Sequence, residues 1–257
     1  MSVEFTRIRV ESDGAVARIV LARPEQKNAL DQETAQQLLH AITTCAQHTD
    51  THVILLKADG PDFCAGADLK ALATMVDAAP EVHYHDAEML GRVFLAMREI
   101  PKPIVAAVQG RALAGGAGLA NACDLVLASD TAQFGYPEVR VGFVPAMVMT
   151  MLRRSVGEKR AFDLVSTGRR ISATEAERIG LVSRVLPSAT FDVDVEQIVV
   201  DLVSTSASAQ RITKQLFYKL DGLDFRSGIA AGMRANVEAR MTDDFRTSVL
   251  SFAHRKG

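Results

Sequence analysis

The sequence predicts an α/β fold followed by a helical C-terminal region. Short apolar, β-branched runs alternate with amphipathic helical segments through the first two-thirds of the chain, and this strand signal fades after Ala146. The chain has 257 residues, of which 48% are hydrophobic, so it can bury a substantial core. No linker-like stretch separates the two parts, and we expect them to pack as one unit.

Six short runs rich in apolar and β-branched residues predict buried strands. They span residues 17–22, 52–58, 104–109, 124–129, 132–136 and 181–186.

Capping residues and apolar spacing predict the helices. Asp31 is a good N-cap for a helix with apolar residues at helical spacing, and a second helix covers 83–99. Ser172 and Glu175 form a capping box at the start of another. The segment after Pro187 is predicted to form three or four helices.

Composition excludes several classes of partner. The formal net charge is −2 and no basic stripe is present, which argues against nucleic acid and anionic membranes. No apolar run approaches the roughly 20 residues of a membrane span, and the first residues do not resemble a secretory leader. Three scattered cysteines (Cys45, Cys64 and Cys123) suit a reducing compartment, so we expect a cytoplasmic protein.

A glycine-rich stretch, ALAGGAGLANACD, begins at Ala112 and turns helical without any reactive side chain. It fits a dinucleotide fingerprint poorly, because Asn121 takes the third small position and several residues separate Gly116 from the predicted strand. Backbone N–H groups at such a helix start can instead hold a developing oxyanion. Close packing explains the glycines equally well.

A second glycine-flanked segment, residues 60–69, favours the oxyanion hypothesis. It also follows a predicted strand, so the two segments can each direct one N–H group at the same oxygen. Cys64 lies within it, but no histidine is placed by sequence to activate that thiol. We therefore interpret Cys64 as a small buried residue.

Glu138 is the candidate acid–base group. It lies in an apolar loop between Gly135 and Gly142, where partial desolvation would raise its pKa toward neutrality. The alternative is a surface acid paired with Arg140.

Two further features predict no chemistry. His83 and His85 would project about 200° apart on a helix, so they cannot share a metal ion, and we expect no metal site. Met147, Met149 and Met151 are expected to line a core or an apolar pocket.

Several motifs, taken together and in order, resemble the crotonase family, also called the enoyl-CoA hydratase/isomerase superfamily. They are LARPEQKNAL at 21–30, PDFCAGADL at 61–69, GRALAGGAGLANACDLVLAS at 110–129, AQFGYPEVRVGFVP at 132–145 and TGRRISATEAERIGLVSRVLP at 167–187. The resemblance implies a spiral of repeated ββα turns over residues 1–195 and a helical trimerisation region over 196–257. It also implies a homotrimer or a dimer of trimers.

The same resemblance implies roles for individual residues. The Ala67 and Gly115 amides would form the oxyanion hole for a thioester carbonyl, with Glu138 as the catalytic acid–base. Coenzyme A is part of the substrate in this family, so no separate cofactor is expected. The residues implied to bind the acyl-CoA are Lys27, Ala65, Asp68, Leu69, Lys70, Leu113, Gly118 and Pro137.

The chain departs from the family pattern at one position. Many family hydratases have a second glutamate, which would fall at Gly118. We expect a hydratase that uses Glu138 alone, and the alternatives are a Δ3-Δ2 enoyl-CoA isomerase or a non-catalytic acyl-CoA binder. Ala146 replaces the aspartate of the hydrolase and dienoyl-isomerase branches. Gly118 is expected to leave space for the acyl chain, walled by Phe143, Met147 and Met149.

Overall fold

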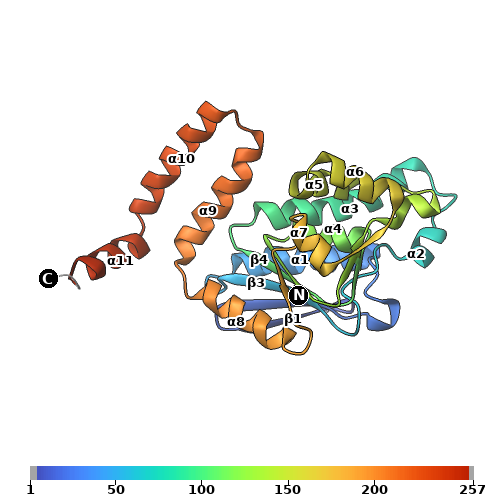
Figure 1. Ribbon diagram of the computed structural model, residues 1–257, viewed down its shortest axis with the longest axis horizontal. Coiled ribbons are helices and arrows are strands. Elements are labelled where there is room, and N and C mark those ends of the chain that lie inside the picture. The colour runs from blue at the N-terminus through green and yellow to red at the C-terminus, as the bar shows by residue number, and fades with distance from the viewer. Residues whose placement is uncertain (1–4, 255–257) are drawn as a thin grey trace.

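The computed structural model describes residues 5–254 and confirms the α/β class with a helical C-terminal region (Figure 1). A six-stranded sheet forms the centre. Only its first pair of strands is antiparallel, and the remaining pairs are parallel. In spatial order the strands are β1 (Ile8–Asp13), β2 (Val16–Leu21), β3 (Val53–Ala58), β4 (Ile104–Val108), β6 (Leu125–Ser129) and β9 (Arg184–Leu186).

A second, three-stranded sheet lies beside the first. It consists of β5 (Arg111–Leu113), β7 (Gln133–Gly135) and β8 (Arg170–Ser172). Strands β5 and β7 are parallel, whereas β7 and β8 are antiparallel.

Two helices begin where the capping residues predict. Asp31 accepts a hydrogen bond from the Thr34 amide at 2.8 Å, and the Ser172 hydroxyl accepts one from the Glu175 amide at 3.2 Å. The helices are α1 (Gln32–Gln47), α2 (Leu69–Ala73), α3 (Pro80–Glu99), α4 (Gly115–Ala122), α5 (Ala146–Val156), α6 (Glu158–Thr167), α7 (Ala173–Arg178), α8 (Phe191–Val203), α9 (Ala207–Lys219), α10 (Phe225–Arg240) and α11 (Asp243–His254). Three 3-10 turns, η1 (Pro24–Gln26), η2 (Pro137–Val141) and η3 (Leu220–Gly222), complete them.

The core has two parts, one on each face of the large sheet. Alternate residues of β3 serve the two faces: Ile54 and Leu56 join the larger cluster with α1 and α3, while Val53 and Leu55 join a smaller one under α8. A strand buried on both faces reads as an unbroken apolar run, which is why β3 was evident from sequence.

Three strands escaped the sequence analysis. In β1, only Ile8 is buried and charged residues follow it, while β5 and β8 have three residues each. The missed β5 matters most, because it ends at Leu113 and leads directly into α4. The expected gap between strand and glycine-rich helix was therefore wrong, and a tight strand-to-helix turn is present.

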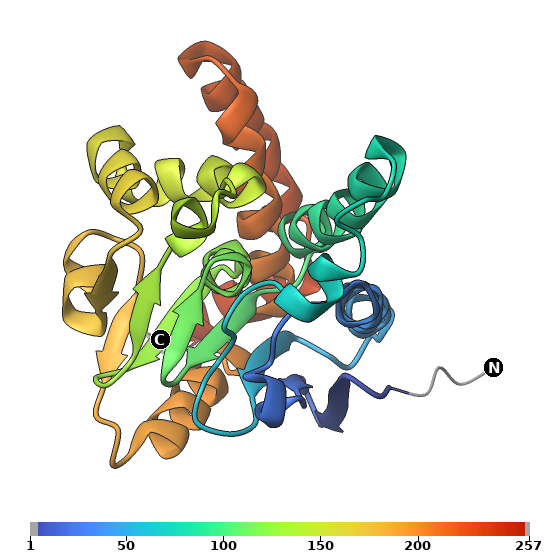
Figure 2. The ribbon, with the colours of Figure 1, turned by 90° about the vertical axis from the view of Figure 1, so that its right-hand side faces the viewer.

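Helices α9 and α10 project from the strand–helix body in both views (Figures 1 and 2). The base of α9 is held by a buried ion pair, in which Lys214 Nζ lies 2.7 Å from Asp124 Oδ2 and also donates to the carbonyls of Met97 and Lys102. Tyr218 donates to the other Asp124 oxygen at 2.7 Å. Within residues 5–254, no helix combines the length and apolarity needed to cross a membrane.

The turn between β5 and α4 is strained at Ala114. Its φ of 51° and ψ of −124° lie in a region that glycine adopts readily and alanine rarely does. Such a conformation typically costs about 1–3 kcal/mol and persists only where surrounding contacts enforce it. Here the Ala114 amide donates to Gly135 O at 2.8 Å, and the Gly118 amide donates to Ala114 O at 3.0 Å.

We predict that Ala114→Gly stabilises the protein, because glycine removes the strain at the expense of a smaller gain in unfolded-state entropy. The expected increase in the free energy of unfolding is about 1 kcal/mol, measured by urea denaturation. As a matched control, Ala117→Gly in the buried interior of α4 should destabilise the protein by about 1 kcal/mol or more. Equal destabilisation by both variants would contradict strain at Ala114.

Candidate active site

Three segments from different parts of the chain run parallel and in register at one edge of the small sheet. Cys64 forms a parallel bridge with Ala112, and Ala112 pairs in turn with Phe134. The aligned backbone bonds include the Cys64 amide to Arg111 O and the Leu113 amide to Cys64 O, both at 2.9 Å. Because the three segments run in the same direction, the residues that follow them lie beyond the same, carboxyl-terminal end of the sheet.

Ala67 and Gly115 each lie three residues beyond the aligned pair. A β-carbon built on Gly66 would stand 3.7 Å from the Gly115 nitrogen, so the two loops are in close contact. Neither the Ala67 nor the Gly115 amide donates to any group among residues 5–254. Gly115 also begins α4, where the helix dipole favours negative charge. Two unpaired donors from separate loops are suited to stabilising an oxyanion.

The glycines of α4 serve different purposes. An added β-carbon would lie 2.4 Å from Cys64 O at Gly116 and 2.2 Å from Val148 Cγ1 at Gly118, so both positions require glycine for packing. At Gly115 the nearest atoms are Leu30 Cδ1 at 3.4 Å and Leu90 Cδ2 at 3.8 Å, which are ordinary contacts. The close-packing interpretation therefore holds for two glycines and does not explain the third.

The structure corrects the expectation of open space at Gly118. Val148 fills the position where a side chain would project, and Phe94 Cζ lies 3.4 Å from it. Of the residues expected to wall the space, Phe143 and Met149 are exposed instead. The sequence missed this because Val148 reaches Gly118 only through the packing of α5 on α4. A second carboxylate at this position would have to displace Val148.

Glu138 is buried near the start of η2, with 9% of its surface exposed. Burial raises its pKa above the ordinary value, and its Oε2 atom has no hydrogen-bond partner among the described residues. Arg140 does not pair with it and donates instead to Thr167 O at 3.4 Å. The surface-pair alternative is therefore wrong, and the predicted desolvated acid is present.

Tyr136 is a polar neighbour that the sequence analysis missed. Its side chain is fully buried, and its hydroxyl has no partner among the described residues. Burial and the charge of Glu138 raise the pKa of this phenol, so it stays protonated. The signal in the sequence was an aromatic residue with a hydroxyl two positions before the acid.

Three of the predicted binding residues, Lys27, Leu69 and Lys70, are exposed. Lys27 is exposed, and its carbonyl accepts a hydrogen bond from the Ala65 amide at 3.0 Å. Leu69 and Lys70 are also exposed, at the start of α2.

The remaining predicted binding residues are less accessible. The Asp68 carboxylate accepts hydrogen bonds from the Lys70 and Ala71 amides and pairs with Arg23. Leu113 is buried. Pro137 opens η2 directly before Glu138.

The cysteines are buried, and the histidine pair is exposed. Cys64 is fully buried, and burial raises its pKa to about 12, so it stays a thiol at neutral pH. This confirms its interpretation as a buried filler. His83 and His85 are exposed on α3. Among residues 5–254, no cluster of histidine, cysteine or acidic side chains has the arrangement of a metal site.

Comparisons with known proteins agree with this architecture. The family model for enoyl-CoA hydratase/isomerase matches residues 11–257. The short-chain-enoyl-CoA hydratase of Clostridium acetobutylicum is 30% identical over 257 residues, covering 99% of this chain and 97% of its own. A Thermus thermophilus relative is 37% identical over 249 residues, covering 97% and 98%.

Solved structures give the same result. The Mycobacterium smegmatis enoyl-CoA hydratase superposes with a TM-score of 0.93 at 30% identity, covering 98% of this chain and 97% of its own. Human enoyl-CoA hydratase domain-containing protein 3 superposes with a TM-score of 0.92 at 29% identity, covering 97% and 98%. The chain therefore belongs to the enoyl-CoA hydratase/isomerase, or crotonase, family, as its sequence motifs predicted.

Proposed function

We propose that this protein hydrates a 2-enoyl-CoA thioester, with the Ala67 and Gly115 amides holding the thioester oxygen and Glu138 as the only acid–base group. The observation that carries the proposal is a buried carboxyl group at the same sheet edge as two unpaired backbone donors. Relatives named as enoyl-CoA hydratases support the reaction class.

The proposed reaction needs one group that first accepts a proton and then donates it. The two amides polarise the carbonyl and make C3 electrophilic, and each such donor is typically worth about 2.7–4 kcal/mol of barrier. The Glu138 carboxylate takes a proton from water as the water oxygen bonds to C3, and the enolate forms. Glu138 then returns that proton to C2. The substrate carries its own coenzyme A, so the reaction needs no other cofactor, nucleic acid or membrane.

Isomerisation of a 3-enoyl-CoA is the second candidate. The packing of Val148 and Phe94 against Gly118 favours it, because this leaves no room for a second carboxylate. In that reaction Glu138 would remove a proton from C2 and return it to C4, with the same enolate held by the same amides. A non-catalytic acyl-CoA binder is the third candidate, and it gives no reason to bury an acid without a partner.

We predict that Glu138→Gln lowers the turnover rate by about 10²–10⁴-fold while acyl-CoA binding is retained. Glutamine keeps the shape of the side chain but cannot accept a proton. Purified protein is incubated separately with a 2-enoyl-CoA and a 3-enoyl-CoA. The products are separated by chromatography, and their masses are measured by mass spectrometry. Added water identifies a hydratase, and an unchanged mass with a moved double bond identifies an isomerase.

The matched control for this experiment is Val139→Ala, an exposed neighbour on the same turn. It should leave the rate within about twofold, in line with other surface substitutions. Full activity in Glu138→Gln would remove Glu138 from the mechanism, and binding without any turnover in the wild-type protein would favour the non-catalytic alternative.

The rate should also depend on pH in a defined direction. The mechanism starts from the carboxylate, and burial holds the Glu138 pKa above 4.5, the ordinary glutamate value. As pH falls through that raised pKa, Glu138 becomes protonated and kcat/KM falls. We predict an acid limb with its midpoint above 4.5, checked by initial rates with circular dichroism confirming the fold at each pH. A rate that stays flat down to pH 4.5 would contradict this assignment.

We further propose that residues 196–257 assemble the protein into a homotrimer or a dimer of trimers, around a core of residues 1–195. One face of α10 presents an exposed apolar stripe that the body of the protein leaves uncovered. Its members, one helical turn apart, are Phe225, Ile229, Met233, Val237 and Met241. A stripe of this extent is typical of an interface. The cytoplasmic location expected from the sequence stays a prediction.

We predict that Met233→Glu, which places a charge at the centre of this stripe, shifts the assembly toward monomer, because burying an unpaired carboxylate opposes association. Sedimentation velocity at micromolar concentration measures the change. The control is Glu238→Lys, which changes the charge at an exposed position of α10 about 140° around the helix from Met233 and should leave the oligomer intact. An unchanged oligomer in both variants would place the interface elsewhere.

A further inference from the structure

We infer that Arg23 is a positioning residue that aims the Ala67 amide into the oxyanion site by holding Asp68 and the turn around it. The inference rests on the proposed role of Ala67.

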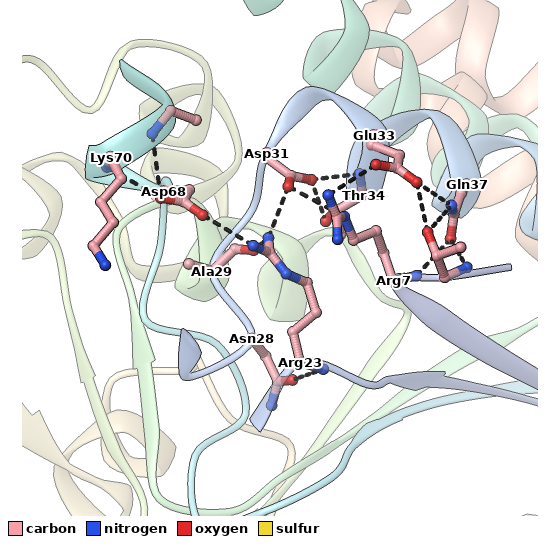
Figure 3. Close-up of polar contacts among 12 residues, drawn as sticks. Arg7, Arg23, Asn28, Ala29, Asp31, Glu33, Thr34, Gln37, Asp68 and Lys70 are labelled. Carbon is pink, nitrogen blue, oxygen red and sulfur yellow. Dashed lines mark hydrogen bonds and ion pairs between the residues drawn. The ribbon is translucent and has the colours of Figure 1, made fainter. Parts of the chain in front are cut away.

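Arg23 joins three acceptors from two segments (Figure 3). Its Nη1 lies 2.9 Å from Asp31 Oδ2 and 3.0 Å from the carbonyl oxygen of Ala29, while its Nη2 lies 3.1 Å from Asp68 Oδ2. The three charged side chains are only 12–15% exposed, so solvent screens these contacts weakly. The planar fork of a guanidinium group can reach all three acceptors at once, whereas an ammonium cannot reproduce this geometry.

Asp68 transmits this anchoring to the turn that contains Ala67. Its Oδ1 accepts hydrogen bonds from the Lys70 and Ala71 amides at 3.1 and 3.3 Å, which caps α2. Its own amide donates to Leu30 O at 2.9 Å. The residue directly after Ala67 is therefore fixed through both its backbone and its side chain.

The peptide unit before Ala67 is fixed from the other side. Gly66 O accepts a hydrogen bond from the Leu30 amide at 2.8 Å. This carbonyl and the Ala67 N–H belong to the same planar trans peptide, so they point in opposite directions. Holding Gly66 O toward Leu30 therefore directs the Ala67 N–H away from Leu30, toward the open side of the loop.

Asn28 fastens the base of the same arrangement. Its Nδ2 donates to the carbonyls of Asp59 and Asp62, both at 2.9 Å, and its Oδ1 accepts from the Arg23 amide at 2.8 Å. Isolated backbone bridges rather than a continuous ladder connect this loop to its neighbours. Its orientation is held by backbone bonds to Leu30 and by side-chain contacts, among which the Arg23–Asp68 pair engages the residue directly after Ala67.

The distribution of charge indicates that Asp68, rather than Asp31, would move if Arg23 were removed. Without Arg23, Asp31 retains the Arg7 guanidinium at 3.3 Å and the Thr34 amide. Asp68 retains no cation within ion-pair distance among the described residues. Two carboxylates that share one cation repel each other once it is removed. The expected movement is therefore of Asp68 and its turn, rather than of α1.

The experiment compares Arg23→Gln with Arg23→Lys and with Arg7→Gln, which removes the other cation on Asp31 without touching Asp68. We expect Arg23→Gln to lower kcat by about 10–100-fold and to change KM by less than about threefold. A misaligned donor weakens the hydrogen bond to the transition state more than the hydrogen bond to the bound substrate. Arg23→Lys should recover part of that loss, and Arg7→Gln should retain the wild-type rate within about twofold.

A spectroscopic readout separates alignment from turnover. The chromophoric thioester 4-dimethylaminocinnamoyl-CoA is bound to the same variants in a Glu138→Gln background, where chemistry is blocked. Hydrogen bonds to its carbonyl shift its absorption to longer wavelength, and we expect a smaller shift with Arg23→Gln than with Arg23 intact or with Arg7→Gln. An unchanged shift and rate in Arg23→Gln would overturn the inference.

The outcomes also distinguish this inference from the function proposed above. No shift in the protein with Arg23 intact would reject the oxyanion role of Ala67 itself. If Arg23→Gln fails to fold, Asp68→Asn replaces it, because asparagine keeps the capping oxygen for α2 but loses the charge that Arg23 binds. A full shift with Asp68→Asn would equally overturn the inference.

Discussion

The candidate site depends on the parallel alignment of three short segments at Cys64, Ala112 and Phe134. Parallel segments in register direct the chain that follows them toward the same end of the sheet, and Ala67, Gly115 and Glu138 each follow one of these segments although they lie far apart in sequence. Cys64 joins this alignment through one isolated bridge. The Ala67 loop is held by backbone bonds to Leu30 together with side-chain contacts that include the Arg23–Asp68 pair.

Three features that cost stability lie at the candidate site. Ala114 occupies a backbone region that favours glycine, and the Tyr136 hydroxyl and Glu138 Oε2 are buried without protein partners. Each of these typically costs about 1–3 kcal/mol. Other buried polar atoms without a protein partner lie elsewhere among the described residues, such as His52 Nδ1 and Asn121 Nδ2, so the candidate site is one of several places that carry such a cost. Natural proteins generally break local rules at functional sites.

The longer strands and the capped helices could be predicted from the sequence, whereas some of the short strands could not. Strands β2, β3, β4 and β6 are apolar runs, and Asp31 and Ser172 mark helix starts by their chemistry. The three-residue strands β7 and β9 lie within longer runs that the sequence showed, whereas β5 and β8 each begin with an arginine next to other non-apolar residues and show no such run. The glycine pattern indicated backbone donors, but it could not separate Gly115 from Gly118. That distinction depends on Val148, which reaches the helix only through tertiary packing.

The absence of a carboxylate at Gly118 leaves both proton transfers of the proposed mechanism to Glu138. Val148 and Phe94 occupy the space where a side chain at Gly118 would project, and burial separately raises the pKa of Glu138. A group that must both accept and return a proton works best when its pKa lies near the operating pH, because neither half of the exchange is then strongly uphill. A raised pKa therefore moves Glu138 toward carrying both proton transfers of the proposed mechanism, so an active site without a second glutamate is chemically workable.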